Sequence, residues 1–164
     1  MKALVATLLI AAMIQGAPAA ALSSAASPLL GSWAVDVSRL PIPPTARPKS
    51  VTITFSDAGG RKWTTHVDIV DANGAASHAV SNAALDGTAA PINDSLEADT
   101  VALKLPAPNV LVMDLVKKGV PASTRVYTVA PDGKTLTETV AYAGGNGLPM
   151  MRTNYFTRVG SRSK

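Results

Sequence analysis

The sequence predicts an all-β protein whose antiparallel strands follow one another as an up-and-down meander and close into a small barrel of about 8–10 strands. Three observations support this fold class. After Gly31, apolar and polar residues alternate with a period near two. Short segments rich in Asp, Asn and Gly separate the alternating runs. After the N-terminal segment, no window combines helical apolar spacing with helix caps. Closure removes the exposed edges of a meander, and an open β-sandwich is the alternative.

Nine strands are expected. In chain order they are Ser32–Ser38, Ser50–Ser56, Lys62–Val70, Ala76–Leu85, Thr100–Leu105, Val110–Val116, Ser123–Val129, Thr135–Tyr142 and Met150–Val159. The first begins after a glycine, and most of the others are joined by hairpin turns such as Asp71-Ala72-Asn73-Gly74 and Asp86-Gly87. The proline-rich connection 41–48 can be neither helical nor a central strand, so we expect it to cross one mouth of the barrel.

The N-terminus is typical of a secretory signal peptide. Lys2 precedes an apolar run from Ala3 to Ile14, and small residues allow cleavage after Ala19 or Ala21. The run is shorter than the roughly 20 residues that span a bilayer, so we expect an exported, periplasmic or secreted protein without a membrane span. The chain then divides into a signal peptide, a flexible leader, a single barrel domain and a polar tail, at residues 1–21, 22–30, 31–160 and 161–164.

Composition excludes several classes of function. The chain has 164 residues, which fits one domain, and it has no cysteine, which excludes disulfides, thiolate nucleophiles and cysteine-bound metals. Its 15 Lys and Arg residues exceed its 11 Asp and Glu residues, but they are scattered, so we expect no nucleic-acid partner. No phosphate loop, nucleophile elbow, zinc motif or dinucleotide fingerprint occurs, and we expect neither a cofactor nor a metal.

The turn Ala130–Lys134 decides which side chains meet inside the barrel. Its proline suits the first central position of a type I turn and its glycine suits a left-handed bulge, which favours a three-residue loop. That loop pairs Val126 with Glu138, turns Arg125 and Tyr127 to solvent and leaves Glu138 inside. A shift by one residue, from a two-residue loop, would instead bring Arg125, Tyr127 and Glu138 onto one face.

In the favoured register Glu138 is a carboxylate shielded among apolar side chains. Burial without a cation disfavours the charged form, so we expect Glu138→Gln to raise stability at neutral pH while changing ligand binding or activity. The alternative is a solvated Glu138 at the rim, where the substitution would be nearly neutral.

Two histidines flank the turn at residues 71–74. A three-residue loop would place Asp68 opposite His78 with His66 on the diagonal, a cluster that could hold a metal or move a proton. A two-residue loop would disperse it. In both registers the polar face of the strand carries His66 and Asp68, so solvated histidines are the favoured interpretation.

The segment Gly31-Ser32-Trp33 resembles the start of the first strand in the calycin group, which includes lipocalins, fatty-acid-binding proteins and small secreted lipocalin-like proteins of bacteria. In that group an Arg near the end of the last strand packs across the Trp, and Arg158 holds the corresponding position. The resemblance implies that Gly31, Trp33 and Arg158 form a structural plug at one end of the barrel. The Arg-x-Tyr pair of fatty-acid-binding relatives is absent from the last strand, where the sequence is Asn154-Tyr155-Phe156, so fatty-acid binding is not implied.

Three functions fit these observations. The first is a binding protein of the cell envelope for a small apolar or amphipathic molecule, and its expected ligand-binding residues are Trp63, Val67, Met113, Glu138 and Tyr142. The second is a cofactor-free isomerase, cyclase or lyase in which Glu138 or His78 moves a proton. The third is a structural or interaction module with a solid core, since the many alanines fit either a cavity or a narrow, filled barrel.

Overall fold

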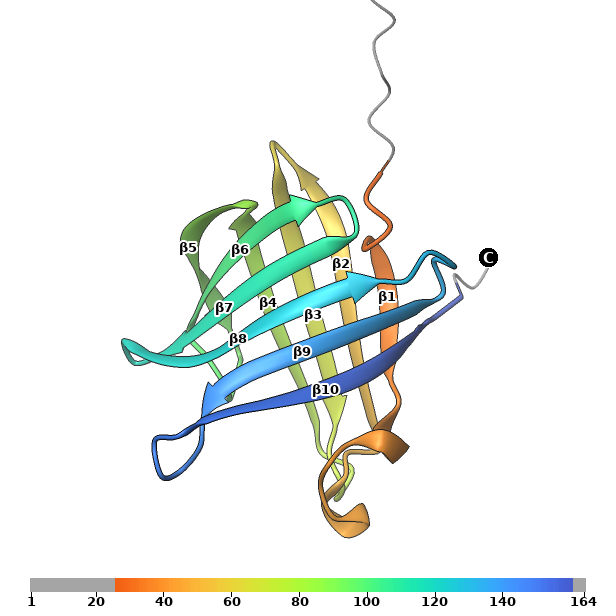
Figure 1. Ribbon diagram of the computed structural model, residues 1–164, viewed down its shortest axis with the longest axis vertical. Helices are drawn as coiled ribbons and strands as arrows, with labels where there is room; N and C mark the ends of the chain where they lie inside the picture. Colours follow the sequence, from red (N-terminus) through yellow and green to blue (C-terminus); the bar gives the residue numbers. More distant parts are fainter. Residues whose placement is uncertain (1–25, 161–164) are drawn as a thin grey trace, which may run out of the picture.

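The structure, a computed structural model, describes residues 26–160. The expected signal peptide, residues 22–25 of the leader and the polar tail lie outside the described residues. Ten antiparallel strands form a closed barrel in which each strand pairs with the next and β1 pairs with β10 (Figure 1). The expected all-β meander and its closure into a barrel are thus confirmed, and the open sandwich is wrong.

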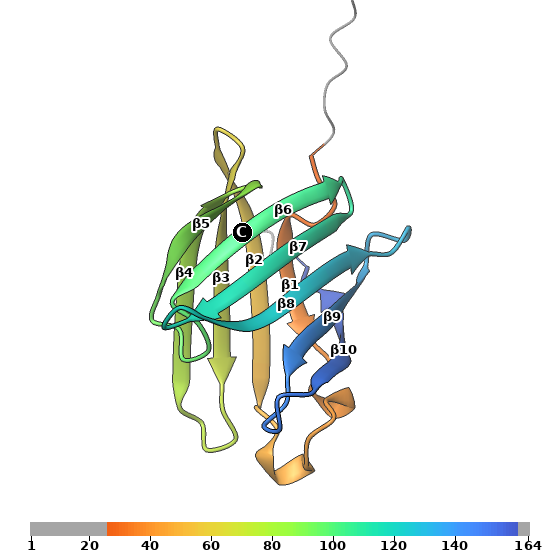
Figure 2. The ribbon, with the colours of Figure 1, turned by 60° about the vertical axis from the view of Figure 1, so that its left-hand side comes forward.

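The strands are 5 to 10 residues long. In chain order they are β1 (Gly31–Val35), β2 (Ser50–Gly59), β3 (Lys62–Val70), β4 (Ala76–Ala84), β5 (Asp86–Asn93), β6 (Thr100–Ala107), β7 (Val110–Lys117), β8 (Val120–Val129), β9 (Thr135–Ala143) and β10 (Pro149–Arg158). Two short 3-10 turns, η1 (Val37–Arg39) and η2 (Pro44–Ala46), follow β1. Figure 2 shows β2–β4 running steeply while β6–β8 cross them at an angle.

Strand β5 departs from the nine expected strands. Its sequence is poor in β-branched residues and contains Pro91, and Asp86-Gly87 suggested a turn rather than a strand start. Few residue pairs join β5 to β4, namely Val80 with Asn93 and Ser81 with Ile92. This irregular strand still bridges β4 and β6 and keeps the barrel closed.

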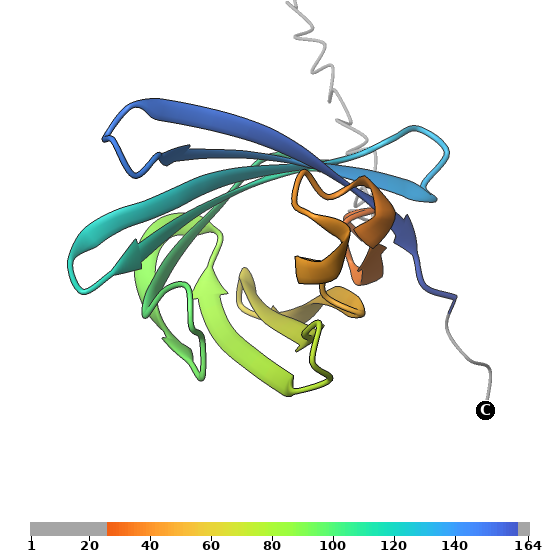
Figure 3. The same ribbon diagram turned by 90° about the horizontal axis from the view of Figure 1, so that it is seen from below.

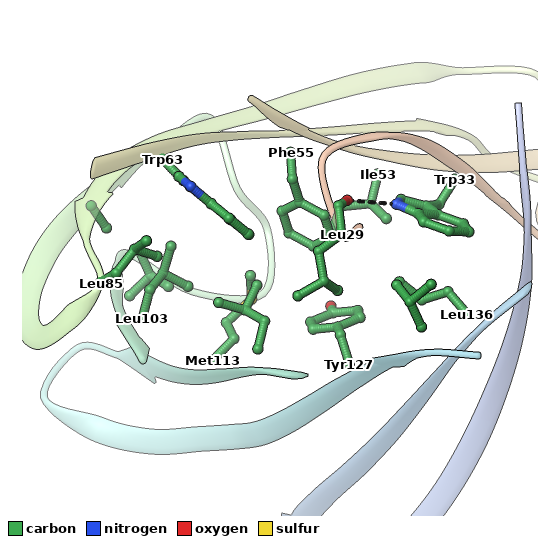
Figure 4. Packing of buried hydrophobic residues seen from close by; sticks show 14 of the residues in the cluster. Leu29, Trp33, Ile53, Phe55, Trp63, Leu85, Leu103, Met113, Tyr127 and Leu136 are labelled. Atoms are coloured by element: carbon green, nitrogen blue, oxygen red, sulfur yellow. Dashed lines mark hydrogen bonds between the residues drawn. The ribbon is translucent and has the colours of Figure 1, made fainter. Parts of the chain in front are cut away.

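One end of the barrel is plugged. Trp33 is fully buried and its indole Nε1 donates a hydrogen bond of 2.8 Å to the carbonyl of Leu29 (Figure 4). The Arg158 guanidinium lies 4.1 Å from the centroid of the Trp33 ring and donates to the carbonyls of Gly133, Leu30 and Pro28. Residues 28–30, expected as leader, therefore belong to the plug, since Leu29 is fully buried.

The core fills the plugged half of the barrel. Phe55 contacts Trp63 and Tyr127, with ring centroids 6.0 and 5.5 Å apart, and Tyr127 in turn meets Phe156 at 6.3 Å. Apolar side chains of the other strands, among them Leu103 and Met113, complete the packing seen in Figure 4. Burial of each large side chain contributes about 1.5–3 kcal/mol to folding.

The segment between β1 and β2 crosses the other mouth, as expected. Figure 3, which views the barrel from that end, shows η1 and η2 lying across part of the opening. The expectation that residues 41–48 contain no helix is wrong in one detail, because Pro44 starts the single turn η2. Proline is compatible with the first turn of a helix, where its missing N–H has no partner to lose. Within residues 26–160, no helix combines the length and apolarity needed to cross a membrane.

Candidate functional site

Three neighbouring strands, β8, β9 and β10, carry polar side chains into the mouth half of the barrel. Their register aligns Tyr127 with Glu138 and Glu138 with Asn154, so these three residues form one layer of the interior. A deeper apolar layer lies toward the plug and an arginine-containing layer lies toward the mouth. From the plug outward, the layers are Val129, Leu136 and Phe156; then Tyr127, Glu138 and Asn154; then Arg125, Val140 and Arg152.

Glu138 is the centre of this cluster and is only 3% exposed. The Tyr127 hydroxyl donates to Oε1 at 2.6 Å, and Asn154 Nδ2 donates to Oε2 at 2.6 Å. Arg125 Nη1 lies 3.3 Å from Oε1 and supplies a positive charge. Two hydroxyl or amide donors and one cation together offset the loss of hydration of the buried carboxylate.

Arg125 connects this buried carboxylate to the mouth. Its Nη2 contacts Oε2 of Glu97, in the loop between β5 and β6, at 2.5 Å. Burial works to lower the pKa of the guanidinium, but its electrostatic interactions with Tyr127, Glu97 and Glu138 outweigh burial and hold the pKa above its ordinary value. Arg125 is therefore a permanent cation held between two acids.

Tyr127 is held in its neutral form. Burial of the phenol and the adjacent negative charge of Glu138 raise its pKa well above the ordinary value of 10.0, against the opposing effect of Arg125. The hydroxyl is thus a hydrogen-bond donor at neutral pH.

A cavity of about 220 Å³ lies beside the cluster. Its apolar wall includes Leu40, Pro41 and Ile42 from the segment across the mouth, and its polar wall includes Glu138 and Asn154. A cavity of about 70 Å³ adjoins it, since residues such as Ile53, Val67 and Tyr127 border both. A third hollow, of about 240 Å³, lies nearer the rim and is bordered by Arg152 and Tyr142. The mouth half therefore offers a partly apolar space made of adjoining cavities that share lining residues.

Four of the five predicted ligand-binding residues border this space. Val67 borders the two inner cavities, Met113 the smaller one, Glu138 the larger one and Tyr142 the hollow at the rim. Trp63 does not. It is a core residue beside a separate, open hollow of about 630 Å³ near the plugged end.

The predicted register at Ala130–Lys134 is off by one residue. Ala130 pairs with Thr135, because four residues rather than three form the loop and the Asp132 carboxylate accepts from the backbone N–H groups of Lys134 and Thr135. This slip turns Tyr127 and Arg125 inward, as in the alternative register, while Glu138 keeps its predicted interior position. The expectation that Glu138 lacks a cation is wrong for the same reason.

The two histidines lie on the outer face of the barrel. Asp68 pairs opposite His78, and His78 Nδ1 contacts the Asp68 carboxylate, with the side chains 69% and 50% exposed. Within the described part of the chain, no three acidic or histidine side chains lie close enough to hold a metal ion. His78 and Glu138 are on opposite faces of the barrel wall and do not form one site.

Sequence reasoning missed the polar residues Glu97, Arg152 and Asn154, which border the larger inner cavity. Glu97 lies in a loop, where the alternation of apolar and polar residues does not predict which way a side chain points. The two β10 residues could have been found, because Phe156 is an inward anchor and a strand alternates with period two.

No protein-family model matches the sequence, and no curated protein is significantly similar to it. The closed antiparallel barrel is consistent with a lipocalin-like fold.

Proposed function

We propose that this chain is an exported, lipocalin-like protein that binds a small apolar or amphipathic molecule inside the mouth half of its barrel. The observation that carries the proposal is the 220 Å³ cavity between the proline-rich segment and the buried cluster around Glu138. Apolar walls with a few fixed polar groups are the usual composition of small-molecule sites.

The size of the cavity limits the ligand. Apolar cavities of about 150 Å³ accept benzene, so a space of about 220 Å³ fits a molecule of about ten non-hydrogen atoms. The adjoining 70 Å³ cavity gives room for a short substituent.

The chemistry of the cluster favours binding over catalysis. The Glu138 carboxylate already accepts from Tyr127, Arg125 and Asn154, so most of its roughly four acceptor positions are used within the protein and little of the group is left to take a proton from a substrate. The other candidate for proton transfer, His78, lies outside the barrel with its side chain 69% exposed.

Export is part of the same proposal and rests on Lys2, the apolar run Ala3–Ile14 and the small residues that follow. N-terminal sequencing of protein from the cell envelope should begin at Ala20 or Leu22. Recovery of intact Met1 on cytoplasmic protein would contradict export without affecting the cavity.

Native mass spectrometry on protein purified from the envelope fraction tests the binding function. We expect a retained small molecule that is lost in Val67→Phe, since Val67 borders both inner cavities. The control is Val112→Phe, on the outward face of β7, between the inward Leu111 and Met113, and it should retain the molecule. Absence of any retained mass, together with no binding of small aromatic probes, would contradict the proposed function.

A further inference from the structure

In the described part of the chain, the buried side-chain amide of Asn154 forms a hydrogen bond through its nitrogen but not through its oxygen. Asn154 is 7% exposed and its Nδ2 donates to Glu138, while within the described chain its Oδ1 has no hydrogen-bond partner although it is shielded from water. The amide cannot be turned around, because Oδ1 would then face the Glu138 carboxylate at 2.6 Å. A side chain that borders the cavity thus holds an unused acceptor.

A second unused group lies two residues earlier on the same face of β10. Arg152 Nε is buried and, among the described residues, has no hydrogen-bond partner. Its guanidinium lies 5.7 Å from the centroid of the Tyr142 ring, and the side chain borders the same cavity. An unused donor and an unused acceptor therefore belong to residues that lie two positions apart on β10 and border the same cavity.

The charges around the cavity are balanced. Two cations, Arg125 and Arg152, and two acids, Glu97 and Glu138, border it, and Arg125 contacts both acids. An additional charged group would therefore be left without an opposite charge of its own inside the barrel.

We propose that the ligand is an uncharged molecule of about ten non-hydrogen atoms in total, which presents a hydrogen-bond acceptor and a hydrogen-bond donor on one edge, as an amide, lactam or urea does, and is otherwise apolar. The inference rests on the proposed binding function. The acceptor of the ligand meets Arg152 Nε and its donor meets Asn154 Oδ1, after small rotations of the two side chains.

Two other ligand classes fit less well. A carboxylate satisfies Arg152 but sets an oxygen against Asn154 Oδ1, so it leaves the acceptor unpaired and adds repulsion. A hydrocarbon leaves both groups unpaired. A third buried atom without a partner in the described chain, Thr65 Oγ1, borders the deeper 70 Å³ cavity and can donate or accept.

Probes of one size separate these classes. Benzamide, benzoate and ethylbenzene should be titrated at neutral pH into the ¹⁵N-labelled mature chain, with the dissociation constant taken from chemical-shift changes. We expect benzamide to bind about tenfold or more tightly than either of the others, a ratio that corresponds to one good hydrogen bond. Equal or tighter binding of benzoate or ethylbenzene would overturn the proposed class.

Variants at Arg152 test whether its Nε is the group that donates a hydrogen bond to the ligand. Arg152→Met should weaken benzamide binding about tenfold and leave ethylbenzene unchanged. Arg152→Lys keeps the charge but lacks Nε, and should weaken benzamide similarly; full retention would show that charge, not the donor, matters. The control Arg61→Met, in the exposed β2–β3 turn near the plugged end, should change neither.

The failures of the two proposals can be told apart. If native mass spectrometry retains a molecule but benzamide shows no preference, the amide-like class is wrong and the binding function stands. If neither experiment detects binding, both are wrong.

Discussion

For the substitution Glu138→Gln, the structure and the sequence alone predict opposite changes in stability. Sequence reasoning treats Glu138 as a buried carboxylate without a cation and expects Glu138→Gln to raise stability. In the structure the carboxylate instead accepts from Tyr127 and Asn154 at 2.6 Å and faces Arg125 at 3.3 Å. The substitution removes a charge that these donors stabilise.

The magnitude follows from the change in each contact. Hydrogen bonds to a charged group contribute about 1.5–3 kcal/mol and neutral ones about 0.5–1.5, so the bonds from Tyr127 and Asn154 each lose about 1 kcal/mol. Loss of the Arg125 contact adds about 1 kcal/mol, limited because Glu97 still pairs with the guanidinium. We expect the free energy of unfolding to fall by about 2–4 kcal/mol.

Urea denaturation of the mature chain at neutral pH measures this change. The matched control is Glu97→Gln, since Glu97 contacts the same arginine but is 59% exposed, and its effect should stay within about 1 kcal/mol. A neutral or stabilising Glu138→Gln would refute the reasoning and restore the expectation of an uncompensated carboxylate.

Three further predictions follow from the plug and the cluster. Trp33→Ala should lower the free energy of unfolding by about 3–5 kcal/mol, and a double-mutant cycle with Arg158→Ala should show clear non-additivity; additive effects would contradict the stacking. Gly31→Ala should destabilise by more than about 1 kcal/mol, because Gly31 has a φ of 115° and a Cβ would lie 2.8 Å from Arg158 Nη1; wild-type stability in urea would argue against this contact. Tyr127 has a raised pKa in the folded state, so its contribution to stability is present below pH 10.0 and is lost as the pH rises above it. Tyr127→Phe, although less stable at pH 8, should therefore lose less stability than the wild type between pH 10 and pH 11, and equal losses would count against this assignment.

The sequence was sufficient for the fold class because alternation and turns are local properties. Glycine-containing turns and period-two runs identify nine of the ten strands, and β5 escaped because Pro91 and its alanines lack the usual β-strand composition. The position of Arg158 over Trp33 could be expected only from a resemblance, since the two residues are 125 positions apart.

The interior position of Glu138 could be predicted from the sequence, but its partners on β8 could not, because they depend on the length of one loop. The interior position of Glu138 follows from alternation within β9, which needs no knowledge of the neighbouring strand. The partners on β8 depend on the length of the Ala130–Thr135 loop, and a change of one residue there reverses every side chain of β8. The Asp132 side chain that fixes this loop accepts from three groups, a detail that composition does not reveal.

The pairing of β1 with β10 has a consequence for folding. The first and last strands of the barrel are neighbours, so the final hydrogen-bonded ladder forms between residues that the whole chain separates. Such non-local pairing slows folding, because a long loop must close before its contacts form. A chain that ends before β10 would leave two open edges at once, on β1 and on β9, each able to recruit a strand from another molecule. Synthesis of the last ten residues of the barrel is thus the step that converts an aggregation-prone sheet into one without edges.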